Sequence, residues 1–335
     1  MCFHRIGEYG AGMDSSGDAH TVGLITPTYR PDLERCALLC ESVDRHVTSF
    51  ARHYLIVADD EIQLFAKFKS ERRLVLPVSE FLPRWLKPMP AFIERNRRRY
   101  WWSLRSAPVN GWLVQQFAKI AAASSIPEHR VCMVDSDVVF FRDFDASLPF
   151  RTGRRPPLYF KPREVATDAP LHARWVASSH RLLGLPPPAF PADDFIGHVI
   201  YWDQQTVRAM TARIEAVTGV EWVEALCRER SISEYMLYGY FVCNNSVAMQ
   251  RHRLTAETPC VSYWDDAPLG EPAIERMLRG AGGDRAAFSA QSISGTPVSR
   301  IRAVLRRLQS DTAGSSASLA PAIETHNEHP APAEQ

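Results

Sequence analysis

Two aspartates separated by one residue, Asp135 and Asp137, are the side chains whose type and spacing most directly indicate chemistry. Apolar runs at 131–134 and 138–141 flank them, which predicts a position at or just past the end of a buried strand. In extended backbone both carboxylates would face one spot and repel each other unless a divalent cation lies between them. Oxygen ligands of this kind favour Mg²⁺ or Mn²⁺ shared with substrate phosphates. The alternative is that one aspartate caps a turn and the other faces water.

Two further segments carry polar side chains in suggestive patterns. Gln115 and Lys119 lie four apart in a segment of helical periodicity, so both heads can point at one target, although an exposed helix lysine is the alternative.

The segment Arg95–Arg105 combines five arginines with three aromatic residues. This composition favours an amphipathic connecting helix. A mobile acceptor-side lid, a membrane contact and stacking on single-stranded RNA are the other interpretations.

Elements that would position these side chains follow from apolar runs and helical spacing. The sequence predicts a strand at 22–26, a helix from Leu33 to Val47 and a second strand at 54–58, which is a βαβ unit with parallel strands. Ligands in open α/β sheets bind outside the carboxyl ends of such strands. Further strands and helices are predicted, the strands at 74–78, 131–134, 138–141 and 195–202 and the helices from 112, over 207–217 and over 222–228.

Composition excludes several classes of protein. The 335 residues are 45% hydrophobic and 23% charged, which indicates a globular chain. A net charge of +1 argues against a generic nucleic-acid binder. No apolar run reaches the roughly 20 residues of a membrane-spanning helix, and the first twenty residues do not resemble a signal peptide. Seven cysteines without a repeated spacing favour a reducing cytoplasm.

The chain is expected to form one globular unit between two irregular ends. We expect a flexible leader at 1–20, a catalytic domain at 21–308 and a disordered tail at 309–335 that is rich in Ser, Ala, Pro and Glu. Within the domain, a nucleotide-binding half at about 21–145 would precede an acceptor half at about 146–308.

Taken together, the ordered motifs resemble the metal-dependent, nucleotide-sugar-using glycosyltransferases of the GT-A type. The resemblance covers roughly residues 21–265 and is carried by Thr26-Pro27-Thr28-Tyr29, Asp59-Asp60, Gly111-Trp112 with Gln115-Gln116 and Lys119, Val134-Asp135-Ser136-Asp137, and Ser233-Glu234-Tyr235 with Leu237-Tyr238-Gly239. It implies an α/β fold with a GT-A-like, Rossmann-type mixed sheet flanked by helices.

The resemblance also implies where the donor binds. The loop after the first strand and the end of the second strand would embrace the nucleoside, which assigns this role to Thr26, Pro27, Tyr29 and Asp59 or Asp60. An N-cap for the following helix is an equal alternative for the two aspartates. Because a glycine-rich phosphate loop is absent from the sequence, the diphosphate would rely on the metal and on Lys119, with Gln115 and Asp135 beside them.

Acceptor chemistry would need a base, and the metal a third ligand. Glu234 is the leading candidate base or sugar-hydroxyl contact, while Ser231-Ile-Ser-Glu234 also fits a capping box. Asp194 is the alternative base. For the third ligand, His252, Asp265 and Ser292 are available and the sequence does not choose among them, although a histidine between two arginines is more typical of a surface.

The expected activity is transfer of a sugar from a nucleotide diphosphate sugar, UDP-linked in the first instance, to a hydroxyl of a glycan or glycolipid in bacterial surface polysaccharide synthesis. The enzyme would be cytoplasmic, with peripheral contact at the inner membrane as an open alternative, and would bind no nucleic acid. Two rival functions use the same features. A sugar nucleotidyltransferase would need a Gly- and Lys/Arg-rich loop after the first strand, and a non-catalytic glycan- or protein-binding domain would show no metal-dependent nucleotide binding.

Overall fold

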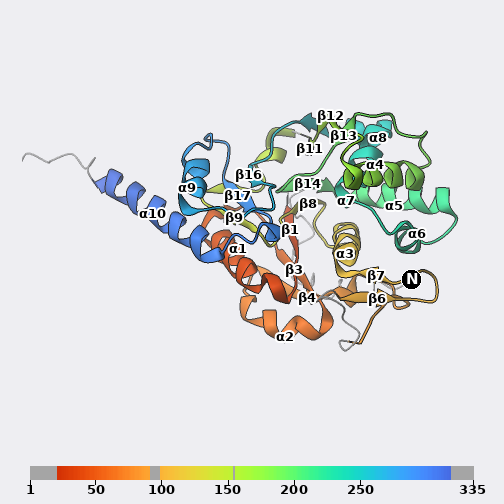
Figure 1. Ribbon diagram of the computed structural model, residues 1–335, viewed down its shortest axis with the longest axis horizontal. Helices are drawn as coiled ribbons and strands as arrows, with labels where there is room; N and C mark the ends of the chain where they lie inside the picture. Colours follow the sequence, from red (N-terminus) through yellow and green to blue (C-terminus); the bar gives the residue numbers. More distant parts are fainter. Residues whose placement is uncertain (1–20, 91–98, 154, 318–335) are drawn as a thin grey trace, which may run out of the picture.

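The computed structural model describes residues 21–90, 99–153 and 155–317, which form a mixed α/β fold (Figure 1). Its centre is a five-stranded sheet in the order β14-β8-β1-β3-β4. Strands β8, β1, β3 and β4 are parallel, and β14 joins the edge antiparallel to β8. The five strands span Val22–Pro27 (β1), His53–Val57 (β3), Arg73–Pro77 (β4), Arg130–Met133 (β8) and Ile200–Asp203 (β14).

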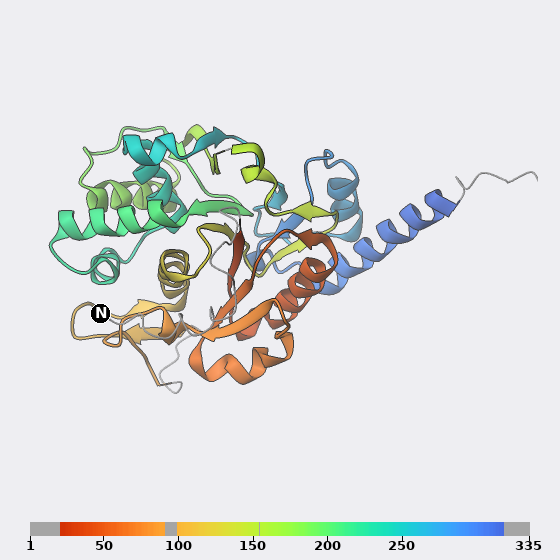
Figure 2. The ribbon, with the colours of Figure 1, turned by 180° about the vertical axis from the view of Figure 1, so that it is seen from behind.

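Alternation along the strands explains how the sheet is covered. Leu55 and Val57 of β3 pack with Cys36 and Cys40 of helix α1 (Leu33–His46) on one face. On the other face, Ile25 of β1 joins the cluster that contains helix α3 (Gly111–Ser125). Figures 1 and 2 show these two helices on opposite sides of the sheet. Burial on both faces accounts for the near-continuous apolar runs that predicted the strands.

The predicted βαβ unit is confirmed, and so are the strands expected near 74–78, 131–134 and 138–141. The strand expected over 195–202 is only half correct, because β14 begins at Ile200. Val199 has a φ of 59°, which lies outside the extended region and interrupts the strand there. The predicted helices at 207–217 and 222–228 correspond to α5 (Gln204–Thr218) and α6 (Trp222–Glu229).

Crossover connections bring the carboxyl ends of β1 and β8 to one position. From β1 the chain runs through α1 to β3 and β4 on one side, and after α3 it returns as β8 on the other side. Such a reversal of strand order leaves a crevice between the two diverging loops, where open α/β sheets bind ligands. The loops at this position are 28–32 after β1 and 134–137 after β8.

Smaller sheets and helices surround the central sheet. A three-stranded sheet, β16-β17-β9, stands beside the loop after β8, because β9 follows that loop directly. The strands of the smaller sheets are β2 (Val47–Thr48), β5 (Lys87–Pro88), β6 (Tyr100–Trp102), β7 (Val109–Asn110), β9 (Val138–Phe140), β10 (Phe144–Asp145), β11 (Pro157–Tyr159), β12 (Lys161–Val165), β13 (Ala192–Asp194), β15 (Arg253–Thr255), β16 (Cys260–Tyr263) and β17 (Ala287–Ala290). The other helices are α2 (Ile62–Phe65), α4 (Pro170–Leu183), α7 (Glu234–Cys243), α8 (Ser246–Gln250), α9 (Glu271–Arg279) and α10 (Val298–Ala317).

Two sequence predictions about the periphery need correction. The expected loss of regular structure after residue 308 is wrong as far as Ala317, where helix α10 ends; Ile301, Val304 and Leu305 pack the first part of this helix on the body. Residues 318–335 and the leader at 1–20 lie outside the described residues. Of the segment Arg95–Arg105, residues 95–98 also lie outside, and residues 100–102 form strand β6 instead of a helix. Its aromatic residues favour a strand, with Trp101 buried and Trp102 exposed in alternation.

No helix in the described ranges has the length and apolar content that crossing a membrane requires.

Candidate functional site

Asp135 and Asp137 lie in the loop that follows β8, at the crevice beside the carboxyl end of β1. The backbone there is a tight turn in which the Val138 N–H donates to the Asp135 carbonyl at 3.1 Å. The prediction of extended backbone is therefore wrong, although the two carboxylates are close enough for Asp135 to raise the pKa of Asp137. Asp135 reaches toward helix α3, whereas Asp137 reaches toward the end of β17.

Lys119 of α3 binds two carboxylates at once. Its Nζ lies 2.7 Å from Asp135 Oδ1 and 2.8 Å from Glu234 Oε1, and it also donates to the Tyr235 hydroxyl at 3.1 Å. Burial opposes the charged amine, but the two carboxylates outweigh it and hold the pKa of Lys119 well above its ordinary value. Burial alone would raise the pKa of Asp135, yet Lys119 and His198 bring it below its usual range. All four members of this cluster are thus charged or hydrogen-bonded at neutral pH.

Glu234 reaches this cluster because helix α7 begins at it. Ser233 caps the helix by accepting from the Met236 N–H, so the capping box predicted from Ser231 is wrong and the Glu234 carboxylate is available for Lys119. Gln116 accepts a hydrogen bond from the Glu234 N–H at 3.0 Å. Sequence reasoning favoured its neighbour Gln115, which is half-buried on the same helix. Gln116, and not Gln115, binds the Glu234 N–H because Gln116 lies on the face of α3 that is directed toward α7.

Asp137 stands in a second cluster, with Asp32 and His198. It accepts from the Ser289 hydroxyl at 3.4 Å and from the Ser292 N–H at 3.2 Å. Burial, followed by the neighbouring Asp135 carboxylate, raises the pKa of Asp137 against the opposing charge of His198. Asp32, which lies at the start of α1, has its pKa raised to about 6 by burial and by the carboxylate of Asp137. Burial and the neighbouring carboxylates therefore outweigh the positive charges near Asp32 and Asp137.

Sequence reasoning missed both Asp32 and His198. Asp32 directly follows Arg30-Pro31 in the loop after β1, so its place beside the end of the first strand was a usable signal. His198 comes from the irregular segment before β14, and its ring lies between the hydroxyls of Ser262 and Ser289 at 2.9 Å and 3.3 Å. The exposed indole of Trp264 stacks on that ring at 4.5 Å. No spacing in the sequence indicates these partners.

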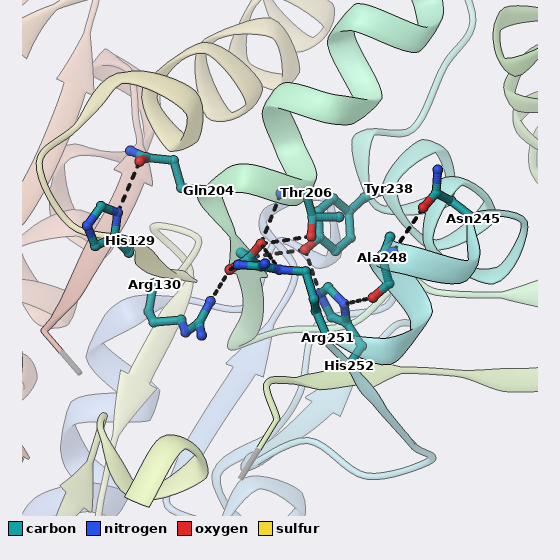
Figure 3. A network of polar contacts seen from close by, with 10 residues as sticks. His129, Arg130, Gln204, Thr206, Tyr238, Asn245, Ala248, Arg251 and His252 are labelled. Carbon is teal, nitrogen blue, oxygen red and sulfur yellow. Dashed lines mark hydrogen bonds and ion pairs between the residues drawn. The ribbon is translucent and has the colours of Figure 1, made fainter. Parts of the chain in front are cut away.

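The predicted third metal ligands lie in different places. His252 belongs to a separate network with Tyr238, whose hydroxyl also accepts from the Asp203 N–H (Figure 3). There its Nδ1 pairs with the Ala248 carbonyl at 2.8 Å, and its Nε2 pairs with the Tyr238 hydroxyl at 2.8 Å. Burial lowers the pKa of His252 to about 4, so the ring is neutral and both nitrogens are engaged. The structure thus does not bring His252 to the two aspartates.

Of the other two candidate ligands, Ser292 contacts an aspartate of the crevice. Ser292 contacts Asp137 through its backbone N–H, and Asp265 is exposed next to Trp264. Among the residues that the structure describes, no group of three His, Cys, Asp or Glu side chains is arranged to hold a metal ion. The available oxygen donors are those of the aspartates at the crevice, and they fit an ion that takes its remaining ligands from water and phosphate.

A pocket of about 280 Å³ opens at the carboxyl ends of β3 and β4. Asp59 accepts from the Ser79 hydroxyl, Asp60 pairs with Arg99, and Trp101 forms part of the wall. The Arg99 hydrogen bonds lower the pKa of Asp60 below its ordinary value. Ala58 stands at the N-cap of the next 3₁₀ turn, so the capping alternative for the two aspartates is wrong. Both aspartates line this pocket.

The predicted contacts from β1 differ in their access to a ligand. Thr26 has no exposed surface, and its hydroxyl donates to the Val134 carbonyl at 2.6 Å, so it joins β1 to the loop after β8 and cannot face a nucleoside. Pro27 ends the strand and is also buried. Tyr29 is 39% exposed and near enough to Asp32 and Asp137 for both to raise its pKa, together with burial. Only Tyr29 offers a free aromatic face.

Asp194 ends strand β13 and is buried. Its Oδ1 accepts from the Ile196 N–H at 3.0 Å, and burial raises its pKa against the opposing charges of His172 and Lys161. These two neighbours belong to α4 and β12.

Comparison with known proteins places the chain in a family. Residues 19–270, about three quarters of the sequence, match the model of a family of unknown function, DUF6492, and the chain belongs to that family. The match includes both loops of the crevice and helix α7, and it ends before α9, β17 and α10. No curated protein matches the chain.

Proposed function

We propose that this member of the DUF6492 family is a metal-dependent glycosyltransferase that moves a sugar from a nucleotide diphosphate sugar to a hydroxyl of a glycan. One observation carries the proposal. Asp135 and Asp137 both lie close enough to Asp32, at the crevice between β1 and β8, to raise its pKa, and a pocket opens at the carboxyl ends of the neighbouring strands β3 and β4. A nucleoside in that pocket would point its diphosphate toward the crevice.

The pocket supplies contacts suited to a nucleoside. Trp101 provides an aromatic wall, Tyr29 offers an exposed ring at the neighbouring loop, and Asp59 and Asp60 supply acceptors for base or ribose hydrogen bonds. Arg99 holds Asp60 ionised and in place. In this proposal the donor is UDP-linked in the first instance.

The crevice would hold the diphosphate through a divalent cation and an amine. Asp137 with Asp135 would bind Mn²⁺ or Mg²⁺, and Asp32 adds negative charge beside them. When bound, the ion supplies charge stabilisation for the leaving diphosphate. Lys119 stands 2.7 Å from Asp135, and the carboxylates of Asp135 and Glu234 keep it charged against the opposing effect of burial. Its part is to keep the Asp135 carboxylate oriented and to add positive charge at the crevice.

Transfer would break the bond between the anomeric carbon and the diphosphate oxygen and form a bond from that carbon to the acceptor oxygen. The acceptor hydroxyl loses its proton in this step. Glu234 is a poor base because it is buried and paired with Lys119, so we assign it the role of positioning Lys119. Asp194, with a pKa raised by burial, remains the candidate base for an inverting reaction.

A specific contact favours the rival function, a non-catalytic binding domain. The Lys119 ammonium already neutralises Asp135, as it would if the metal site had been lost. The nucleotidyltransferase alternative has less support, since the residues after β1 are Thr28, Tyr29 and Arg30 and then a 3₁₀ turn, without glycine.

Thermal unfolding in the presence of UDP, GDP or CMP, with and without Mn²⁺, tests the proposal. We expect one nucleoside diphosphate to raise the melting temperature only with Mn²⁺, and Asp137→Ala to abolish the shift. The matched control is Asp143→Ala, because the Asp143 side chain is 93% exposed outside the crevice. A nucleotide-induced rise in melting temperature that is the same without Mn²⁺ and in Asp137→Ala would refute the metal site. Complete lack of nucleotide binding would favour the non-catalytic domain.

A further inference from the structure

A second pocket, of about 180 Å³, lies between helices α1 and α10 over strand β9. Its floor is apolar and includes Leu38, Phe140 and Leu305, each of which is at least nine-tenths buried. Figures 1 and 2 show α10 leaving the body of the molecule beyond this point. None of the lining residues belongs to the candidate site, so this pocket needs an explanation of its own.

Three guanidinium groups surround one carboxylate at the rim. Arg302 of α10 forms a two-pronged ion pair with Glu41 of α1, and Arg45 and Arg306 also line the pocket near that carboxylate. Three positive charges against one negative charge leave an excess of two among these lining residues. His46, the remaining basic side chain of the lining, pairs with Asp143. The rim therefore carries positive charge that the pocket itself does not neutralise.

Helix electrostatics explain only part of this arrangement. Arg45 stands in the last turn of α1, where a cation is favourable because it faces the negative end of the helix dipole. Arg302 and Arg306 lie four apart on α10, so their like charges share a helix face and destabilise the helix slightly. An anion bound between Arg302 and Arg306 would attract both guanidinium groups and so offset their repulsion.

We propose that this pocket binds the phosphate group of a small phosphomonoester, with Arg45 and Arg306 as direct contacts and Arg302 shared between Glu41 and the ligand. Guanidinium groups recognise phosphate through paired N–H donors, and a phosphomonoester carries up to two negative charges, which matches the excess. At about 180 Å³ this pocket is smaller than the pocket of about 280 Å³ beside β3, which favours a phosphate with a few carbon atoms over a nucleotide. The apolar floor suits the carbon part.

This chemistry has two sources, a soluble sugar or glycerol phosphate and the headgroup of an anionic lipid. The first experiment titrates the full chain with inorganic phosphate and with glycerol 3-phosphate by calorimetry at low ionic strength. Arg45→Gln and Arg306→Gln should each weaken glycerol 3-phosphate binding by about tenfold, the loss of one charge-assisted contact. Glu41→Gln should strengthen binding several-fold, because it removes the competing carboxylate and releases Arg302.

Arg276→Gln is the matched control, since Arg276 is exposed on the neighbouring helix α9 and does not line the pocket. Opposite effects of the arginine and Glu41 variants, with no effect of the control, support a phosphate site. A purely structural cluster would not bind tighter after Glu41→Gln. Equal binding by wild type, Arg45→Gln and Arg306→Gln, or no binding of either probe by the wild type together with no vesicle binding, overturns the proposal.

Vesicle flotation distinguishes the two sources. Full chain is mixed with phosphatidylcholine vesicles and with vesicles that also contain phosphatidic acid, whose headgroup is a phosphomonoester. Binding to the second kind alone, lost in Arg306→Gln, assigns the site to a lipid headgroup. Binding of glycerol 3-phosphate without vesicle binding assigns it to a soluble ligand. Vesicle binding that persists in both arginine variants contradicts the pocket as its cause. Each outcome is independent of the glycosyltransferase proposal.

Discussion

The two ends of strand β8 hold acidic side chains in contrasting surroundings. At the amino end, Asp203 of β14 lies opposite Arg130 and is almost fully buried. Arg130 and Arg251 both pair with its carboxylate, and Thr206 donates to it through its N–H and hydroxyl at 2.9 Å and 2.8 Å (Figure 3). At the carboxyl end, Lys119 pairs directly with Asp135, whereas burial and neighbouring carboxylates raise the pKa values of Asp32 and Asp137.

The contrast separates a structural centre from a candidate site. Around Asp203 the cations outnumber the carboxylate, and the carboxylate accepts hydrogen bonds from every side, so it holds β14, β8 and the segment after α8 together. At the other end, burial and mutual repulsion raise the pKa of Asp32 and Asp137. Folding does not by itself favour such an arrangement, and an added cation would relieve it.

Removing the carboxylate of the structural centre should give the largest effect on stability. Asp203→Asn leaves the guanidiniums of Arg130 and Arg251 without their buried counter-charge, and breaking a buried pair in this way costs about 3–5 kcal/mol. Urea unfolding should therefore show a lower midpoint with an unchanged slope. Asp135→Asn should cost less, because Lys119 keeps its pair with Glu234. Equal losses at both ends would contradict the distinction between them.

Much of the fold follows from the sequence, because strand and helix periodicity are local. The apolar runs of β1, β3 and β8 reflect burial on both faces of the sheet. The helical spacing of α1 and α3 reflects burial of one face of each helix. Local strain was not predictable. The φ of 59° at Val199 shortens β14, and an apolar-polar pattern around Asp135 looks the same for a turn as for extended backbone.

The site was predicted only where it follows a strand end. Asp135, Asp137 and Lys119 could be identified because they stand close to predicted elements, whereas Asp32 and His198 owe their places to long-range packing. His198 contacts Ser289, 91 residues later, and no spacing reports that contact. Thr26 was misassigned for the opposite reason, since its strand-end position is real but its side chain points into the core.

The pH dependence of stability should differ in sign between the two ends. At the structural centre, the pKa of His252 falls from 6.5 to about 4 on burial, so between these values the unfolded chain binds a proton that the native ring rejects. Stability contributed by the neutral ring is complete above pH 6.5 and falls by up to about 3 kcal/mol as the pH drops toward 4. His252→Gln should be less stable at pH 7.5 but should lose less on acidification. Urea unfolding at pH 7.5 and 4.5 measures how much free energy of unfolding each protein loses on acidification. An identical loss in wild type and His252→Gln would contradict the prediction.

Asp32 should show the opposite behaviour. Its pKa rises from 3.8 to about 6 through burial and the charge of Asp137, so the native protein binds the proton first as the pH falls. The ionised carboxylate then costs the native state up to about 3 kcal/mol above pH 6, and the cost disappears near pH 4. Asp32→Asn should therefore be more stable than wild type at pH 7.5 and equally stable near pH 4. A less stable variant at pH 7.5 would mean that Asp32 is fully compensated.

The smallest effect should come from a neutral contact at the candidate site. Ser289→Ala removes the hydroxyl that lies 3.4 Å from Asp137 Oδ1 and 3.3 Å from His198 Nε2. Because the Ser292 N–H still donates to Asp137 at 3.2 Å, the free energy of unfolding should fall by about 1 kcal/mol or less. If Asp137 binds the cation, the Mn²⁺-dependent nucleotide shift should weaken but persist. A loss near that of Asp203→Asn would instead make this end a second structural centre, since only a carboxylate needed by the fold depends so strongly on one hydroxyl.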